Sequence, residues 1–349
     1  MAPSLFGLEN TNRKFSDPAA WGKNQFNSSF PTALACYMHS KKLDANYLAM
    51  VDGRIQVDQI SIAELYGQEP LSDDIFFAFE STYVSLQPLI VGQLPRTDLV
   101  VTSKSNPSTQ TRALEIKLTA IPDNTTADLH EDKYGSEIVV RPDSIFYLGA
   151  MIYLNNKTIL PPIFNKKKCL VKDWTDPSDV KSNLDDIREV LRNISCASSS
   201  IQSPFLLQPI WKTLGKRSVL ADNCLDLFVW STLGFLDFII DIGDSKTSAN
   251  MTRPMRTVVW VYKVLEELVS HGQADFEKIV DASSFNTKND KAFAASGAVT
   301  HKYMVCPNLV KPRILKTAIK DIVLGGGQHF LSPERRFDAI LVNSPDIFK

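Results

Sequence analysis

Polar and apolar residues alternate over Arg112–Leu118, which predicts a strand, since successive side chains of a strand point to opposite faces. Glu115 and Lys117 then share one face, two residues apart. The preceding run Thr97–Thr102 is mostly apolar and also predicts a strand, and its one acid is Asp98. Because a short polar loop joins the two runs, we expect a hairpin that brings Asp98 beside Glu115 and Lys117.

Other segments predict a mixture of strands and helices. The chain around the turn Asp52-Gly53 alternates in the manner of two strands. Apolar residues at helical spacing predict three helices, at Pro31–Lys42, Asp179–Ile194 and Pro254–His271. The apolar stretch Leu225–Ile240 predicts a buried helix or a pair of strands. We therefore expect an α/β fold, with a mixed sheet flanked by helices and with additional helical and loop segments.

The composition is that of an ordinary globular protein with a sizeable core. Of the 349 residues, 44% are hydrophobic and 22% are charged, which suits one large domain or two. The Ser-rich stretch 197–203 is the best candidate for an internal boundary. We divide the chain into an N-terminal segment (1–70), a central segment (71–196) and a C-terminal part (197–349), which packs on the central segment or belongs to the same domain.

Cysteine usage and the N-terminus indicate a cytoplasmic protein. Five cysteines are scattered without a CxxC or Cys/His cluster, which argues against zinc and against a disulfide framework. The first residues lack the basic and apolar regions of a signal peptide. The longest apolar stretch is interrupted by polar residues, so no membrane span is expected.

The residues Asp98, Glu115 and Lys117 suit phosphodiester hydrolysis. Two carboxylates can hold Mg²⁺ through oxygen atoms, with the backbone carbonyl of Ile116 as a further candidate ligand. The metal would lower the pKa of bound water, and an ammonium group on the same face could orient that water. The pattern resembles the PD-(D/E)XK nuclease motif. The alternative is a hairpin with a solvated, charged face and no catalytic role.

Glu80 is the only charged residue in the apolar stretch Ile75–Val91. A carboxylate among apolar residues is costly to bury unless it is paired or binds a metal. The simpler interpretation places Glu80 at an exposed edge, where Glu80→Gln would be silent. The alternative is an extra acid beside the metal site, where the substitution would raise the Mg²⁺ requirement.

A net charge of −1 means that a DNA-binding surface must concentrate its cations on one face. The alternatives to DNA contacts are a solvated N-terminal arm that is held in place by its aromatic residues, and lysines that only form a solvated surface. Asn and Gln suit adenine edges, whereas Arg and Lys suit guanine edges or phosphates. The candidates are Arg13, Lys14, Lys23, Asn24, Gln25, Asn27, Lys104, Arg141, Lys166, Lys167, Lys168, Arg253 and Arg256.

Three stretches together resemble the HindVP-like family of type II restriction endonucleases. They are SLFGLENTNRKFSDPAAWGKNQFNSSFP, FESTYVSLQPLIVGQLPRTDLVV and RALEIKL. The resemblance implies Mg²⁺-dependent cleavage of palindromic double-stranded DNA of the GRCGYC type by a homodimer. It also implies a separate DNA methyltransferase in the same system. Asp98, Glu115 and Lys117 would be the catalytic triad, although Pro95 lies three residues before Asp98 rather than next to it.

These observations favour a sequence-specific type II restriction endonuclease with a PD-(D/E)XK core. Two other functions stay open: a structure-specific or repair nuclease with the same core, and a non-catalytic DNA-binding protein. The intact Asp98, Glu115 and Lys117 argue against the non-catalytic protein. A cleavage assay with and without Mg²⁺ separates the three.

Overall fold

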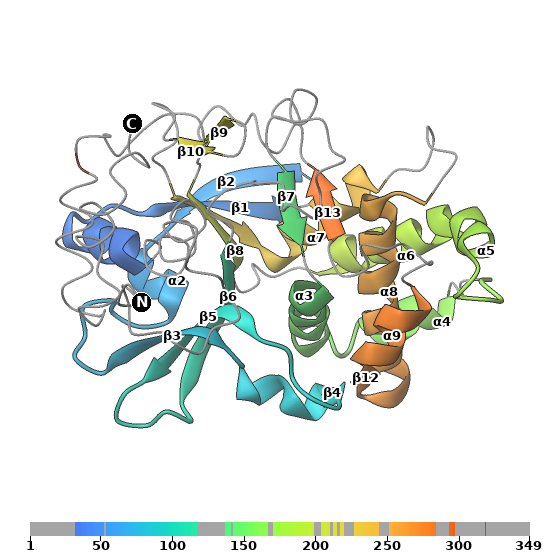
Figure 1. The fold of residues 1–349 in the computed structure, drawn as a ribbon, viewed down its shortest axis with the longest axis horizontal. Coiled ribbons are helices and arrows are strands. Elements are labelled where there is room, and N and C mark those ends of the chain that lie inside the picture. The colour runs from blue at the N-terminus through green and yellow to red at the C-terminus, as the bar shows by residue number, and fades with distance from the viewer. Residues whose placement is uncertain are drawn as a thin grey trace, which may run out of the picture.

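The computed structural model describes most of the chain between residues 32 and 296. The described residues are 32–51, 54–116, 137–140, 142–166, 170–198, 204–209, 212–214, 217–219, 227–243, 251–283, 293–296 and 318. Their elements form a mixed α/β fold, in which a central sheet is flanked by helices (Figure 1). The expected mixed sheet with flanking helices is confirmed.

The central sheet has seven strands in the order β2-β1-β11-β8-β6-β5-β3. The strands are β1 (Ala45–Val51), β2 (Arg54–Ile60), β3 (Ile75–Ser81), β5 (Thr97–Ser103), β6 (Gln110–Ile116), β8 (Pro204–Pro209) and β11 (Leu227–Ser231). The pairs β1·β11 and β6·β8 are parallel, and the other neighbours are antiparallel. Strands from all three segments of the chain therefore contribute to one sheet.

Two antiparallel hairpins match the sequence pattern. Strands β1 and β2 pair on either side of residues 52 and 53. Strands β5 and β6 pair through Leu99–Leu114 and Val100–Ala113, with an irregularity after Val101. Both hairpins are local, which explains why short-range alternation was enough to predict them.

Helices cover both faces of the sheet. The helices are α2 (Ile62–Tyr66), α3 (Pro142–Asn155), α4 (Leu160–Lys166), α5 (Pro177–Ser182), α6 (Leu184–Ala197), α7 (Thr232–Ile242), α8 (Arg253–His271) and α9 (Phe276–Ala282), with the 3-10 helix η1 (Val84–Leu89). Helix α7 packs on β1, β8 and β11, and α3 packs beside β5. Helix α8 packs against α3, α6 and α7, whereas α2 and the helical residues 32–40 lie at the other side of the sheet (Figure 1).

Two sequence predictions about helices were wrong in detail. The segment Asp179–Ile194 is not one helix, because Asn183 separates α5 from α6 and acts as the C-cap of the first. The stretch Leu225–Ile240 contains one strand, β11, followed by helix α7, rather than a helix or a strand pair alone.

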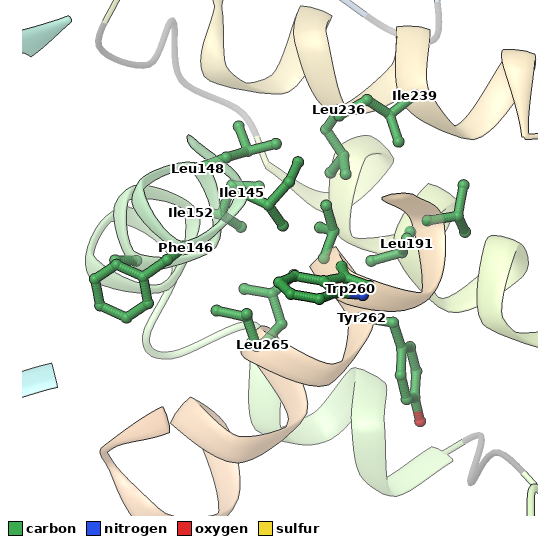
Figure 2. Packing of buried hydrophobic residues seen from close by; sticks show 14 of the residues in the cluster. Ile145, Phe146, Leu148, Ile152, Leu191, Leu236, Ile239, Trp260, Tyr262 and Leu265 are labelled. Carbon is green, nitrogen blue, oxygen red and sulfur yellow. The ribbon is translucent and has the colours of Figure 1, made fainter. Parts of the chain in front are cut away.

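Most of the core lies between the sheet and the helices α3, α6, α7 and α8. Figure 2 shows Ile145 and Leu148 of α3 close to Trp260 of α8, with residues of α6 and α7 closing the same cluster. Each fully buried aliphatic side chain of this kind contributes about 1.5–3 kcal/mol to folding. Helix α3 is therefore held firmly in the centre of the molecule.

Helices α3 and α8 approach closely at Gly149. A Cβ atom on Gly149 would lie 2.6 Å from Cγ1 of Val264, which is too short for a real contact. Glycine at this position lets the two helix backbones come together. Helix α8 itself is bounded by the N-cap Thr252 and by Gly272, which has a φ of 73°.

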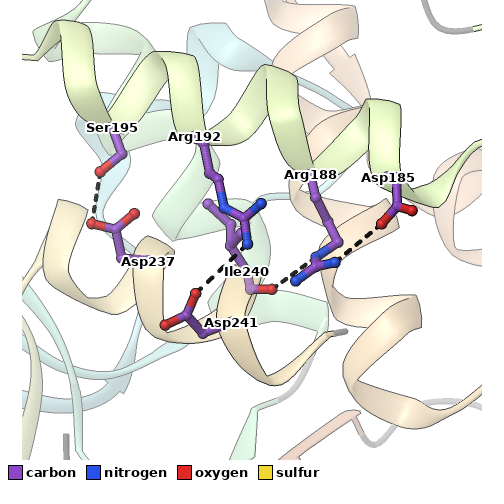
Figure 3. A network of polar contacts seen from close by, with 7 residues as sticks. All are labelled: Asp185, Arg188, Arg192, Ser195, Asp237, Ile240 and Asp241. Carbon is purple, nitrogen blue, oxygen red and sulfur yellow. Dashed lines mark hydrogen bonds and ion pairs between the residues drawn. The ribbon is translucent and has the colours of Figure 1, made fainter. Parts of the chain in front are cut away.

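Polar contacts fasten α6 to α7 (Figure 3). The buried Arg188 donates from Nε to the carbonyl oxygen of Ile240 at 3.1 Å. The hydroxyl of Ser195 donates to Oδ2 of Asp237 at 2.8 Å. These contacts lie within the helical layer, away from the strands that carry the predicted catalytic acids, so we assign them a structural role.

Three small two-stranded sheets complete the described elements. They pair β4 (Ile90–Val91) with β12 (Ala274–Asp275), β7 (Glu137–Val140) with β13 (Phe293–Ser296), and β9 (Lys212–Leu214) with β10 (Arg217–Val219). Among the described residues, no helix has the length and apolar character needed to cross a bilayer.

Candidate active site

One row of positions crosses all seven strands of the sheet, and we call it the cross-sheet row. Paired residues of neighbouring strands lie on the same face of a sheet, so a row of such pairs shows which residue types that face presents. The strand pairings, extended by one residue to the partners of Asp98 on either side, give the row Val57, Leu48, Trp230, Leu206, Glu115, Asp98 and Glu80.

The cross-sheet row changes from apolar to acidic at β6. Leu48 and Trp230 belong to the core beneath the helices, and Val57 packs against that core. Glu115 and Asp98 continue the row from β6 to β5, on the face that α3 covers. The two predicted acids therefore lie on adjacent strands, as the hairpin prediction requires.

Asp98 lies half-buried at the start of β5 and is held by the backbone of β6. Its Oδ2 atom accepts a hydrogen bond from the backbone N–H of Ile116 at 2.8 Å. The neighbouring Thr97 donates from its hydroxyl to the carbonyl oxygen of Leu114 at 3.0 Å. These two contacts fix the position of the Asp98 carboxylate relative to Glu115.

Glu115 is buried, with 6% of its surface exposed. The alternative of a solvated charged face on the hairpin is therefore wrong at this residue. A buried carboxylate is costly unless hydrogen bonds or a cation compensate its charge. Burial at the strand end, beside a second carboxylate, is typical of a site that binds a cation.

Glu80 and Lys117 are described less fully than these two acids. Glu80 belongs to β3, and its position lies between the pairs Phe79–Leu99 and Ser81–Thr97, opposite Asp98. Lys117 follows β6 directly and lies outside the described residues. The roles of both residues stay predictions.

The donor set fits a small divalent cation. Among the described residues, no group of three or more His, Cys, Asp and Glu side chains could hold a metal ion. Mg²⁺ nevertheless suits a site with one or two carboxylates, since it keeps several water ligands and binds substrate phosphate. Asp98, Glu115 and the carbonyl oxygen of Ile116 can supply the protein ligands.

Tyr147 of α3 lies against this end of the sheet. Its hydroxyl donates to the carbonyl oxygen of Pro95 at 2.8 Å and accepts from the backbone N–H of Tyr83 at 3.0 Å. Burial raises the pKa of Tyr147 to about 12, and the charges of Asp143 and Glu115 add to this rise. Our sequence analysis did not select Tyr147, because an aromatic residue in an apolar helix carries no signal of such a contact.

Among the predicted DNA contacts, the structure describes the side chains of Lys104, Lys166 and Arg256. Lys104 is exposed in the β5–β6 turn, six positions beyond Asp98 and so about 20 Å away along the strand. Lys166 is exposed at the end of α4, which lies beyond α8 as seen from β6 (Figure 1). Arg256 is only 5% exposed, so little of its guanidinium can reach a phosphate.

The other candidates lie outside the described part of the chain. They are Arg13, Lys14, Lys23, Asn24, Gln25, Asn27, Arg141, Lys167, Lys168 and the side chain of Arg253. Their contacts with DNA stay predictions.

Comparisons with known proteins agree on one family. The profile of the family described as HindVP restriction endonuclease matches residues 21–348. The type II restriction enzyme HgiDI of Herpetosiphon aurantiacus is 43% identical over 350 residues, covering 99% of this chain and 97% of the relative. A probable type II restriction enzyme, HindVP of Haemophilus influenzae, is 44% identical over 351 residues, covering 99% and 95%. No solved structure matches the chain.

Proposed function

Because the chain belongs to the HindVP restriction endonuclease family, we propose that this type II restriction enzyme hydrolyses phosphodiester bonds of double-stranded DNA with Mg²⁺. The observation that supports this most directly is the acidic end of the cross-sheet row. Glu115 is buried there beside Asp98, whose carboxylate is already oriented by Ile116. We further propose that the sheet is the core of a PD-(D/E)XK nuclease.

Each residue of the site has a proposed role. Asp98, Glu115 and the carbonyl oxygen of Ile116 would hold Mg²⁺, and Glu80 is the candidate for an additional ligand. The bound metal supplies acidified water and offsets negative charge on the phosphate. Lys117 directly follows Ile116, and its ammonium would orient the attacking water.

We propose a palindromic recognition site of the GRCGYC type and an active homodimer, both from the family resemblance. A palindrome has two equivalent half-sites, and a two-fold dimer presents one reading surface and one active site to each strand. A separate methyltransferase would protect the host DNA without forming a stable complex with this chain.

Plasmid cleavage tests the proposed function. Purified protein is incubated with plasmids that contain or lack GRCGYC sites, with Mg²⁺ or with EDTA, and Glu115→Gln serves as the inactive control. Discrete fragments that need both Mg²⁺ and the site support the proposal. Cleavage governed by DNA structure would indicate a repair nuclease, and binding without cleavage would indicate a non-catalytic protein.

A further inference from the structure

We propose that Tyr147 is a positioning residue for the ion site, because its hydroxyl holds together the two chain segments that lead out of β3 and into β5. This inference rests on the proposed metal-binding role of Asp98 and Glu115. It adds a residue of α3 to a site that the sequence motif places wholly on strands.

The hydroxyl of Tyr147 bridges two backbone segments. It donates to the carbonyl oxygen of Pro95, three residues before Asp98. It accepts from the N–H of Tyr83, three residues after Glu80. One oxygen atom therefore connects the segments that flank both acid positions.

The two hydrogen bonds of the Tyr147 hydroxyl lie where the backbone pairing between β3 and β5 ends. The last pair between β3 and β5 at this end of the sheet is Ser81 with Thr97. Beyond it, Tyr83 leads into η1 and Pro95 belongs to the incoming loop. A proline cannot donate a backbone hydrogen bond, so the carbonyl of Pro95 is the group that this residue offers. The phenol supplies a donor and an acceptor in place of a further ladder pair.

The bridge requires a neutral phenol. A phenolate could accept from Tyr83 but could not donate to Pro95. Burial keeps Tyr147 protonated, and only 3% of the residue is exposed. The charge of Glu115 adds to the rise in the pKa of this hydroxyl.

Helix α3 makes the bridge rigid. It is packed against α8 through the close approach at Gly149 and through the buried side chains of Ile145 and Leu148. The ring of Tyr147 also contacts Phe146 edge-on, with 6.0 Å between the ring centroids. The hydroxyl of Tyr147 thus holds the backbone at the ends of β3 and β5 in a fixed position relative to helix α3.

The test compares Tyr147→Phe with Tyr153→Phe, a substitution of a tyrosine that lies about 1.7 turns further along the same helix. Ca²⁺ binding to each full-length protein is measured by calorimetry without DNA, together with the Mg²⁺ concentration for half-maximal cleavage. Residues that orient ligands typically change metal affinity by about 10–100-fold. We expect Tyr147→Phe to weaken Ca²⁺ binding about tenfold and to raise the Mg²⁺ requirement similarly, and Tyr153→Phe to change neither.

Asp98→Asn separates failure of this inference from failure of the proposed function. Suppose that Asp98→Asn loses Ca²⁺ binding but Tyr147→Phe binds Ca²⁺ with the affinity of the unmodified protein. The proposed role of Tyr147 is then overturned, whereas the proposed ion site is supported. If Asp98→Asn also binds normally, the ion site itself is misplaced.

Hydrogen exchange of the unmodified protein provides a measurement that does not depend on the folding of a variant. Because the amide of Tyr83 is bonded to Tyr147, we expect Ca²⁺ to slow its exchange. If saturating Ca²⁺ left the exchange rate of the Tyr83 amide unchanged, this would contradict the coupling between Tyr147 and the ion site.

Discussion

Asp98 accepts a hydrogen bond from the backbone N–H of Ile116, with 2.8 Å between Oδ2 and the nitrogen. The acid of β5 is thereby tied to the residue that follows Glu115 on β6. This bond holds the Asp98 carboxylate on the strand next to Glu115. The bond also gives Asp98 a structural role that can be separated from its proposed catalytic one.

Substitutions at Asp98 should separate these two roles. Asp98→Asn keeps an oxygen that can accept from Ile116, so we expect lost cleavage with little change in stability. Asp98→Ala leaves a buried N–H without its acceptor, which costs about 1–3 kcal/mol. Cleavage and urea unfolding are measured for both variants, and normal cleavage by Asp98→Asn would remove this residue from the site.

Lys117 is expected to serve the chemistry rather than the binding of metal or DNA. Lys117→Ala should therefore abolish cleavage while Ca²⁺ affinity and binding of a cognate duplex stay within about twofold of normal, because its ammonium would act on the attacking water. Calorimetry and a gel-shift assay provide the two binding measurements. A variant that cuts at the normal rate would contradict the proposed triad.

Glu80 lies in register with Asp98, which favours the interpretation that it supports the metal site. We expect Glu80→Gln to raise the Mg²⁺ concentration for half-maximal cleavage about tenfold, the lower end of effects seen for residues around a metal. Glu64→Gln is the matched control, since Glu64 is an exposed acid on α2, at the other side of the sheet. Equal Mg²⁺ requirements in the two variants would support the simpler interpretation, in which Glu80 lies at an exposed edge and Glu80→Gln has no effect on cleavage.

Stability should fall in alkaline solution in part because of Cys36. Burial raises the pKa of its thiol from the usual 9.0 to about 12, so between these pH values the folded thiol stays protonated while the unfolded one ionises. The unfolded state then binds fewer protons, and the free energy of unfolding decreases with pH by up to about 1.4 kcal/mol per unit. The contribution is intact below pH 9.0 and is lost as the pH approaches about 12.

Urea unfolding between pH 8 and pH 11 measures this effect. The decline should be shallower in Cys36→Ala than in Cys196→Ala, which replaces an exposed cysteine of α6. Identical declines in the two variants would show that Cys36 does not titrate in this way.

The proposed homodimer can be tested by light scattering with and without a GRCGYC duplex. We expect two chains per duplex, because a net charge of −1 gives a single chain little overall attraction to phosphate, and two chains pool their basic surfaces. Supercoiled plasmid should be converted to linear product without accumulation of the nicked form. One chain per duplex, or nicking alone, would show that the dimer proposal is wrong.

The sequence predicted those parts of the fold and site that depend on near neighbours. The β5–β6 hairpin followed from alternation and a polar loop, and it placed Asp98 and Glu115 on adjacent strands. The insertion of β8 and β11 between β6 and β1 was not predicted. Pairing between strands that are far apart in the chain is set by tertiary packing, which periodicity does not report.

The break at Asn183 and the contacts of Tyr147 were missed for related reasons. Both α5 and α6 continue the same apolar spacing, so the pattern alone gives one helix. Tyr147 resembles any buried aromatic residue until the fold brings Pro95 and Tyr83 to its hydroxyl. The burial of Arg256 likewise depends on how α8 is packed rather than on its position near a helix start.

The sheet order has a consequence for how the protein is made on the ribosome. Strands β1 and β2 emerge first and β3, β5 and β6 follow, but β8 and β11 are needed to join these two groups. The second of them ends at Ser231, so about two-thirds of the chain must be synthesised before the sheet can close. A nascent chain that stops earlier holds both acids on an unsupported hairpin. Translation therefore delays the assembly of the proposed active site until about two-thirds of the protein has been made.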